Sequence, residues 1–355
     1  MSKTRVIGLD IGTTAVRAAE VEVGRGGSSG GRQPTVVRFG QAPLPLGAVR
    51  DGEVAEPETV ATAIRQLWQQ HKFSHKDVVL GLGNQRVMVR DLALPAMPMA
   101  QLRASLPFQV QDMLPVAVDD VLLDYYPSGQ FQGQTGPMVS GLLVAATKDT
   151  VHANTAAVET AGLRPLMVDL TAFALTRFQA RGELAEGTVA LVDIGAKVTI
   201  VVIATHGVPR LVRILPGGGQ DATDAVANDV GVASADAENL KRQVGVGFAV
   251  PAELRPAAEA VARSTQNLVE AIRNTLVYYA ANNPGHAAQV VVLTGGGSQL
   301  AGLGQYLSSA SRMNVTYGHP LSTLRPGGSL PQGDHLAQVG HALAVPVGLA
   351  LGDVA

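Results

Sequence analysis

The sequence predicts an α/β protein built from two related halves that face each other. VIGLDIGTTAVRAAEV at residues 6–21 and VALVDIGAKVTIVVI at 189–203 both carry Asp-Ile-Gly inside an apolar run rich in β-branched residues. The same motif in two similar frames indicates an internal duplication. A third stretch, VVVLTGGGSQLAG at 290–302, has a buried strand followed by glycines and a helix, which is typical of α/β folds.

Composition indicates a globular protein of the cell interior. The chain has 355 residues, of which 46% are hydrophobic and 16% charged, so it can bury sizeable cores in two domains. Its net charge of -2 gives no basic field, and nucleic acid is therefore not an expected partner. Because the chain has no Cys, disulfides and thiolate metal sites are excluded. No apolar run approaches the roughly 20 residues that a membrane span needs, so we expect a soluble protein.

The first half reads as a hairpin, a loop, a strand and a helix. The strand, turn and strand at 5–23 contain the first Asp-Ile-Gly unit. The Gly/Ser-rich segment at 24–34 predicts a flexible loop. A further strand begins near residue 35, and apolar residues at helical spacing predict a helix over 57–71.

Residues 78–168 predict a small α+β unit inserted into this first half. DVVLGLGNQRVMVRDLALP at 77–95 predicts a β-hairpin that turns at Gly-Asn-Gln. A helix follows over 99–115, and two strands are expected on either side of a Gly/Gln loop at 128–137. After this unit and the second Asp-Ile-Gly unit, a long helical region is expected over about 220–283.

The first Asp-Ile-Gly turn has the chemistry of a phosphate site. Gly12 lets phosphate oxygens approach the backbone N–H groups closely, and the hydroxyls of Thr13 and Thr14 add donors. Asp10 cannot bind phosphate, because like charges repel. Its natural partner is a Mg²⁺ ion carried by a nucleotide, reached through water.

The second turn repeats this arrangement from the opposite half. It supplies Asp193 as a second carboxylate for the metal and Gly195 as a second point of close approach, and Lys197 belongs to the same candidate site. For either turn alone, a plain β-hairpin with an exposed aspartate is an equally good interpretation. The two copies together favour a pair of hairpins that close on one metal-bound triphosphate.

Two glycine turns and one charged pair extend the candidate nucleotide site. Gly295, Gly296 and Gly297 lie between a buried strand and a helix, where a backbone can approach a nucleotide. Gly218 belongs to a similar turn, LPGGGQ, which a simple loop into a helix explains equally well.

Glu238 and Lys241 lie one helical turn apart and are the predicted clasp for a ribose and purine edge. A solvated ion pair is the commoner explanation for such spacing. Because the sequence also contains the glycine and phosphate turns, the hypothesis that this pair contacts a ribose and purine is favoured more than the spacing alone would justify.

In this order, the motifs resemble the actin/Hsp70/sugar-kinase ATPase superfamily over almost the whole chain. The resemblance implies an actin-like ATPase fold, with two RNase-H-like domains around a cleft that binds ATP with Mg²⁺. MVDLTAFAL at 167–175 is similar to the first connecting helix, which places Asp169 where relatives orient the attacking water. Ala196 stands where many ATPases have Ser or Thr, and Asp169 is shorter than Glu. We therefore expect at most a slow ATPase and leave open whether the protein is an enzyme.

Three segments resemble the PilM family of type IV pilus assembly more closely. They are LPLGAVRDGEV at 44–54, RDLALPAMPMAQLRASLPFQVQDMLP at 90–115 and DAENLKRQVG at 236–245. In that family, and in the division protein FtsA, a compact insertion called 1C replaces the usual actin subdomain 1B. FtsA ends in an amphipathic membrane helix, whereas this sequence ends in GLALGDVA, which favours PilM.

The resemblance also implies partners and a location. It implies a cytoplasmic protein that captures the amino-terminal peptide of PilN in a groove between subdomains 1A and 1C. PilN would hold it at the inner membrane, with pilus motor ATPases as further candidate partners and self-association left open. The implied subdomains are 1A at 1–77 with 169–186, 1C at 78–168, 2A at 187–219 with 287–355, and 2B at 220–286.

Alternatives from other classes stay open at this point. A small-molecule kinase of the same superfamily would need a catalytic base for its acceptor, and no strand end clearly provides one. An FtsA-like division protein and a purely structural protein with an inactive nucleotide fold are the others.

Overall fold

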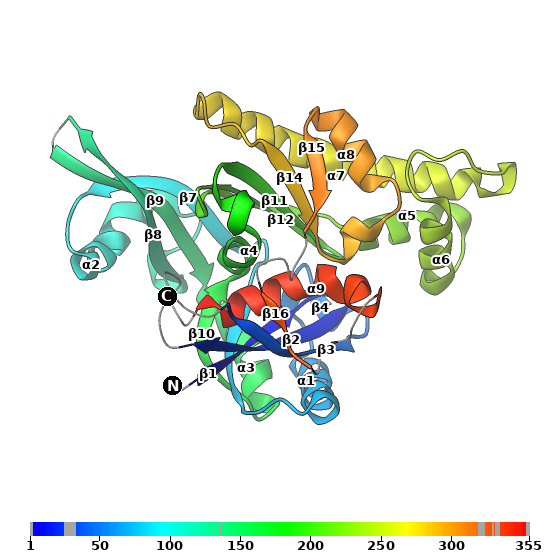
Figure 1. Cartoon of the computed structure of the whole chain (residues 1–355), viewed down its shortest axis with the longest axis horizontal. Helices are drawn as coiled ribbons and strands as arrows, with labels where there is room; N and C mark the ends of the chain where they lie inside the picture. The colour runs from blue at the N-terminus through cyan, green and yellow to red at the C-terminus, as the bar shows by residue number, and fades with distance from the viewer. Residues whose placement is uncertain are drawn as a thin grey trace.

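The computed structural model describes residues 3–24, 33–134, 136–318, 324–328, 330 and 334–352, so most of the Gly/Ser-rich segment lies outside the described residues. It contains two α/β halves, each built on one large sheet (Figure 1). The first sheet has the strand order β10-β6-β1-β2-β3-β16. Its strands are β1 Lys3–Ile11, β2 Ala15–Gly24, β3 Thr35–Pro43, β6 Asp77–Leu82, β10 Arg164–Leu170 and β16 Arg325–Pro326.

The second sheet repeats the topology of the first, in the order β13-β12-β11-β14-β15. In each sheet the first three strands form an antiparallel meander, and two later strands add in parallel beside the first strand. This shared order confirms the predicted duplication. The strands are β11 Thr188–Ile194, β12 Val198–Thr205, β13 Val208–Pro216, β14 Val290–Thr294 and β15 Asn314–Tyr317.

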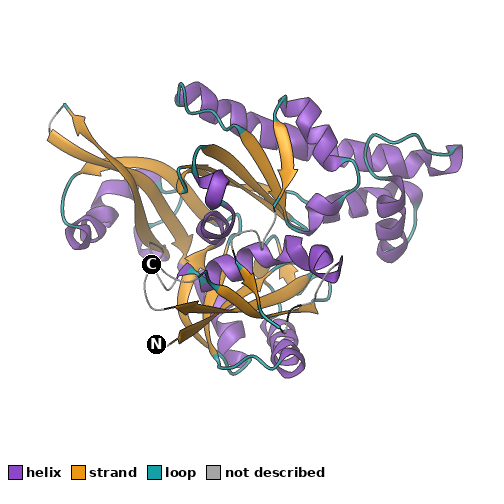
Figure 2. Ribbon diagram, viewed as in Figure 1, coloured by secondary structure: helices purple, strands orange, loops and turns teal. Residues whose placement is uncertain are grey.

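Two helices, α4 and α9, lie between the large sheets, and four others cover their outer faces (Figure 1 and Figure 2). α4 and α9 share one hydrophobic core with both sheets, in which Ala174 and Leu343 pack between the first sheet and residues such as Leu191. α1 and α3 cover the far face of the first sheet, and α7 and α8 cover that of the second. The helices are α1 Pro57–His71, α3 Lys148–Thr160, α4 Thr171–Gln179, α7 Arg255–Asn282, α8 Leu303–Ser311 and α9 Asp334–Ala350.

The C-terminal part of the chain returns to the first half. α9 packs on β1 and β2, and β16 pairs in parallel with β3. The range 287–355, expected within subdomain 2A, therefore includes β16 and α9, which attach to the first sheet. An apolar helix pattern shows that a face is buried, but it does not show against which sheet.

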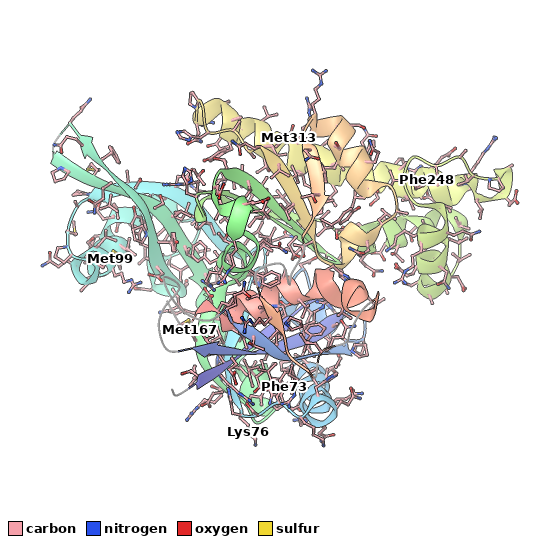
Figure 3. All side chains as sticks on the ribbon, viewed as in Figure 1. Phe73, Lys76, Met99, Met167, Phe248 and Met313 are labelled. Atoms are coloured by element: carbon pink, nitrogen blue, oxygen red, sulfur yellow. The ribbon has the colours of Figure 1, made fainter. Side chains whose placement is uncertain are left out.

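The insertion carries its own three-stranded sheet in the order β7-β9-β8. α2 packs on one face of this sheet through Leu102 and Leu106. Figure 3 labels Met99 at the start of this helix. The long β8–β9 ribbon projects away from the rest of the molecule (Figure 1). The elements are β7 Val87–Pro95, α2 Met99–Val110, β8 Val121–Gly133 and β9 Gly136–Thr147, with short 3₁₀ turns at Gln111–Met113 and Val118–Asp120.

Two local predictions in this region are wrong. β6 and β7 do not form the hairpin expected at 77–95, because β6 pairs with β1 and β10 while β7 pairs with β9. The loop expected at 128–137 is mostly strand, because β9 supplies ladder partners to its polar residues. The separate sheet therefore occupies 87–147, a narrower range than the expected 78–168.

A small helical unit completes the second half, as predicted for 220–283. α5 Gly219–Val230, α6 Ser234–Val244 and part of α7 enclose their own small core around Val226 and Val261. A two-stranded ribbon, β4 Val49–Arg50 with β5 Glu53–Val54, lies in the first half. Every helix in the described part of the chain lacks the length and apolar character that a bilayer crossing requires.

Candidate nucleotide site

A cavity of about 680 Å³ lies between the two halves. Its walls come from the β1–β2 and β11–β12 turns, the glycine turn after β14, and the starts of α4, α5 and α6. Residues of α9 close one side. A cavity of this size and mixed polarity suits a ligand of nucleotide dimensions.

The two Asp-Ile-Gly turns have the same backbone geometry. In the first, the Gly12 N–H donates to the carbonyl of Ala15 at 3.0 Å, and in the second the Gly195 N–H donates to the carbonyl of Val198 at 2.9 Å. Both turns line the cavity from opposite halves. The duplication therefore extends to the hydrogen bonds of the turns themselves.

Two half-buried carboxylates, one from each Asp-Ile-Gly turn, line the cavity. Burial raises the pKa of Asp10, although the neighbouring Arg17 lowers it. Burial and then the charge of Asp10 raise the pKa of Asp193 to about 7. The effect of Asp10 on the pKa of Asp193 means that the two carboxylates are close enough to repel, a condition that a divalent cation relieves.

The donor set fits Mg²⁺ carried by a ligand rather than a metal held by the protein alone. Carboxylate oxygens are the ligands that Mg²⁺ prefers, and Asp10 and Asp193 supply them. The described residues contain no group of three or more His, Cys, Asp or Glu that would hold a metal ion. The remaining oxygens would therefore have to come from water and from the ligand.

Arg17 is a cavity residue that the sequence reading missed. Its Nη1 lies 3.5 Å from Oδ2 of Asp10, which is its cross-strand neighbour in the β1–β2 hairpin. In the second hairpin the neighbour of Asp193 is Ile200. The signal was present in the sequence, because the hairpin register alone places Arg17 opposite Asp10.

The triple glycine after β14 packs directly on the second turn. Gly295 has φ 82°, and a Cβ there would lie 2.4 Å from the Ile194 carbonyl oxygen and 2.7 Å from Oδ1 of Asp193. A side chain at Gly295 would therefore clash and strain the backbone. This close approach brings the glycine turn and the carboxylate of Asp193 to one wall of the cavity.

Gly218 has a different position from the one expected. It caps α5, and a Cβ would lie 2.4 Å from the Gly195 carbonyl oxygen, so it packs behind the second turn and not in the cavity lining. The next two N–H groups, of Gly219 and Gln220, donate to the carbonyls of Gly195 and Ala196 at 2.9 and 2.8 Å. The start of α5 is thus fastened to the second turn, and its first N–H groups are not available to a phosphate.

Lys197 also points away from the cavity. Its Nζ contacts Oδ1 of Asp221 at 2.7 Å and forms a second ion pair with Asp224, both on α5. Asp221 in turn accepts a hydrogen bond from the Gly218 N–H at 2.8 Å. Lys197 therefore ties the second turn to α5.

Asp169 lies at the end of β10, outside the cavity lining. It forms an ion pair with Arg177 of α4, whose Nε donates to the Gly348 carbonyl of α9 at 3.1 Å. Burial raises the pKa of Asp169, and Arg177 opposes this rise. The residue of this segment that does line the cavity is Thr171, at the start of α4.

The charged pair of α6 is held in a defined arrangement. Lys241 Nζ contacts Oε2 of Glu238 at 2.5 Å and donates to the Gly219 carbonyl at 3.0 Å. Thr223 donates to the same carboxylate at 2.6 Å. Burial would raise the pKa of Glu238, but the bonds from Lys241, Thr223 and Arg242 outweigh it, and the pKa is lowered.

Most of the predicted site residues meet in this cavity, and three do not. Asp169, Lys197 and Gly218 are absent from its lining, for the reasons given above. The predicted residues that line it are Asp10, Gly12, Thr13, Thr14, Asp193, Gly195, Glu238, Lys241, Gly295, Gly296 and Gly297. Lining residues that were not predicted include Arg17, Thr171, Gln220, Thr223, Arg242 and His341.

The repeated sheet, the two helices between the sheets and the cavity define an actin-like protein. Two solved structures share this fold at low identity. The ethanolamine utilization protein EutJ from Carboxydothermus hydrogenoformans has a TM-score of 0.57 at 15% identity, over 99% of this chain and 91% of that one. MreB5 of Spiroplasma citri, bound to ADP, has a TM-score of 0.52 at 14% identity, over 88% and 91%.

Within this class, the chain belongs to the family of the type IV pilus assembly protein PilM, whose model matches residues 8–354. The solved PilM-PilN type IV pilus biogenesis complex is similar to it throughout. The TM-score is 0.84 and the identity 27%, over 99% of this chain and 99% of that one.

Proposed function

We propose that the protein is a nucleotide-binding adaptor of type IV pilus assembly, which binds the amino-terminal peptide of a PilN-type membrane protein. The observation that carries the nucleotide half is the cavity between two geometrically equivalent Asp-Ile-Gly turns. The similarity over full length to a PilM that was solved in complex with PilN supports the partner.

The proposed nucleotide is ATP with Mg²⁺. Gly12, Thr13 and Thr14 of the first turn would bind the phosphates, facing Gly195 of the second. Asp10 and Asp193 would hold the metal, which supplies the charge that offsets two carboxylates and a triphosphate.

Glu238 and Lys241 would contact the ribose and base, together with the glycine turn at Gly295, Gly296 and Gly297. Their side chains are already fixed by Thr223 and the Gly219 carbonyl, so little ordering would be needed on binding. That ADP is bound in the structure of MreB5 is consistent with a nucleotide in this fold.

We propose binding with at most slow hydrolysis. Ala196 offers no hydroxyl in the second turn, and the carboxylate of Asp169 is engaged by Arg177. Neither residue presents a group that would orient an attacking water. The family assignment also disfavours the alternative of a small-molecule kinase.

We propose subdomain limits that follow the sheets. Subdomain 1C would correspond to 87–147, and the C-terminal segment from 325 would belong to 1A. Subdomain 2B would remain the helical unit of α5, α6 and α7.

The proposed peptide surface lies where the inserted sheet faces β10. Asp124 of β8 is close enough to Asp169 to affect its pKa, and Tyr126 stacks on Phe173 of α4, so this face of β8 is directed at the first half. Leu122 follows on the same face by strand alternation and is 48% exposed.

β10 is the edge strand of the first sheet, and it offers a second row of contacts. Leu166 and Met167 are 57% and 41% exposed although both are apolar (Figure 3). An extended peptide could pair with this edge and place apolar side chains on both strands. Such a peptide would hold the protein at the cytoplasmic face of the inner membrane, near the motor ATPases.

Two experiments test the two halves of the proposal separately. Asp10→Ala should abolish the stabilisation of the protein by MgATP in a thermal-shift assay while leaving the circular dichroism spectrum unchanged. Unchanged nucleotide affinity would refute the site. Titration with a synthetic PilN amino-terminal peptide tests the partner. If neither calorimetry nor fluorescence anisotropy detects binding, the proposed partner is refuted and the nucleotide site is not affected.

A further inference from the structure

The two turns differ in one charged residue, although their backbones match. Asp10 has Arg17 as its cross-strand neighbour, and Asp193 has Ile200. Both neighbours line the cavity. The two hairpins therefore contribute two carboxylates and one guanidinium to the cavity, in an arrangement that the duplication alone would not produce.

Arg17 lies directly over the first turn. Its Nη1 is 3.5 Å from the Asp10 carboxylate and 3.0 Å from the place where a Cβ of Gly12 would be. Its Nε is buried, and no hydrogen-bond partner for it exists among the described residues. Arg17 therefore has one long ion pair, to Asp10, and one N–H donor without a partner among the described residues. Such a guanidinium can donate a hydrogen bond to a further acceptor.

The other arginine and lysine side chains of the cavity are committed elsewhere. Lys241 and Arg242 both bind Glu238 on α6, and Lys241 also donates to the Gly219 carbonyl. Lys197 of the second turn is bound to α5. Among the described Arg and Lys residues that line the cavity, Arg17 is thus the one beside the phosphate turns.

We propose that Arg17 is a built-in counter-cation that does part of the work of the metal at this site. In the empty cleft it balances Asp10. When a nucleotide enters without a divalent cation, Arg17 shifts its free donors toward the phosphates and makes binding possible. When the metal enters with the nucleotide, the metal takes over Asp10, and Arg17 matters less. This inference rests on the proposed nucleotide site.

The test is a comparison of metal-free and metal-bound nucleotide on the full chain. We would measure the Kd of ATP in EDTA and of MgATP for the wild type, Arg17→Gln and Arg17→Lys. Arg17→Gln should weaken ATP in EDTA by about tenfold or more, as expected for the loss of one charge-assisted hydrogen bond. MgATP affinity should change less than about threefold, because the freed Asp10 binds the metal better.

Arg17→Lys keeps the charge and should keep metal-free binding within about threefold of the wild type. Arg242→Gln is the matched control, since it removes a cavity cation that pairs with Glu238 and not with Asp10, and it should lower both affinities by a similar factor. Equal losses for ATP and MgATP in Arg17→Gln would overturn the inference, as would equal behaviour of the Lys and Gln variants. A wild type that binds neither form would refute the proposed nucleotide site itself, and this inference with it.

Discussion

Tyr126 of the inserted sheet stacks on Phe173 of α4, with ring centroids 4.7 Å apart and 37° between the ring planes. Two residues before Phe173, Thr171 lines the cavity. One helix therefore touches both the nucleotide site and the face of β8 where we place the peptide. A movement of α4 on nucleotide binding would therefore displace Tyr126 and the face of β8 to which it belongs.

We predict that Tyr126→Leu uncouples the two sites. In the wild type, MgATP should change the Kd of the PilN peptide by about fivefold or more, a typical coupling between sites. In the variant this ratio should approach one, because the ring contact that transmits the movement is lost. Peptide titrations with and without MgATP measure it. Tyr278→Leu, which removes an exposed ring that contacts Arg213, should keep the wild-type ratio.

Leu166→Ser should weaken peptide binding by about tenfold, as expected when an apolar contact at the centre of an interface is removed. Fluorescence anisotropy with a labelled peptide measures this change. Phe248→Ser is the matched control, because Phe248 is equally exposed at 57% but lies in the second half. If the two substitutions weaken peptide binding equally, the proposal that the peptide binds at β10 is contradicted.

Lys197→Met should destabilise the protein by about 1–2 kcal/mol, because two ion pairs that join the second turn to α5 are lost together. It should also weaken nucleotide binding, since α5 is fastened to the second turn through this residue. Urea unfolding measures the first effect. Arg263→Met breaks the more exposed pair with Asp229 and should cost no more than about 1 kcal/mol.

Gly218→Ala should destabilise the protein by about 1–3 kcal/mol, because the new methyl group would meet the backbone oxygens of Gly195 and Ala196. The backbone at Gly218 is extended, so the effect would come from the clash alone. Gly328→Ala is the control, since no atom of the described residues lies within 4 Å of its Cβ position. Thermal unfolding of both variants separates a clash from a general intolerance of substituted glycines.

The stability of the second half should fall in acid through Glu238. Its folded-state pKa is lowered, so its ionised form stabilises the protein above the unfolded pKa of about 4.3. This contribution is lost as the pH falls through the lower folded value. Urea unfolding between pH 3 and pH 6 should therefore show a smaller loss of stability in Glu238→Gln than in the wild type. Identical slopes would contradict the role of the charged clasp.

The duplication and the turn residues could be read from sequence because they depend on local pattern. Asp10, Gly12, Asp193 and Gly195 follow apolar strands directly, so each local segment specifies where its turn falls. The Glu238 and Lys241 pair is fixed by helical spacing alone. These features require no knowledge of the tertiary structure.

The predictions that the structure contradicts concern residues whose positions depend on contacts with parts of the chain that are distant in sequence. β6 is apolar except for Asp77, and its partners β1 and β10 lie far away along the chain, so a local pattern does not show which strands it pairs with. Lys197 is turned from the cavity by acids on α5, and Asp169 by an arginine on α4. Side-chain direction at these positions is decided by charge partners that a local pattern does not reveal.

The inserted sheet touches the second half as well as the first. Arg210 of β13 donates to the Ser128 carbonyl of β8, so the insertion is fastened on both sides of the cleft. Because the insertion contacts both halves, any rotation of one half relative to the other acts on the insertion. Tension applied to the insertion from a bilayer-anchored peptide would thus be divided between both lobes, and the molecule would act as a force-bearing link rather than a passive tether.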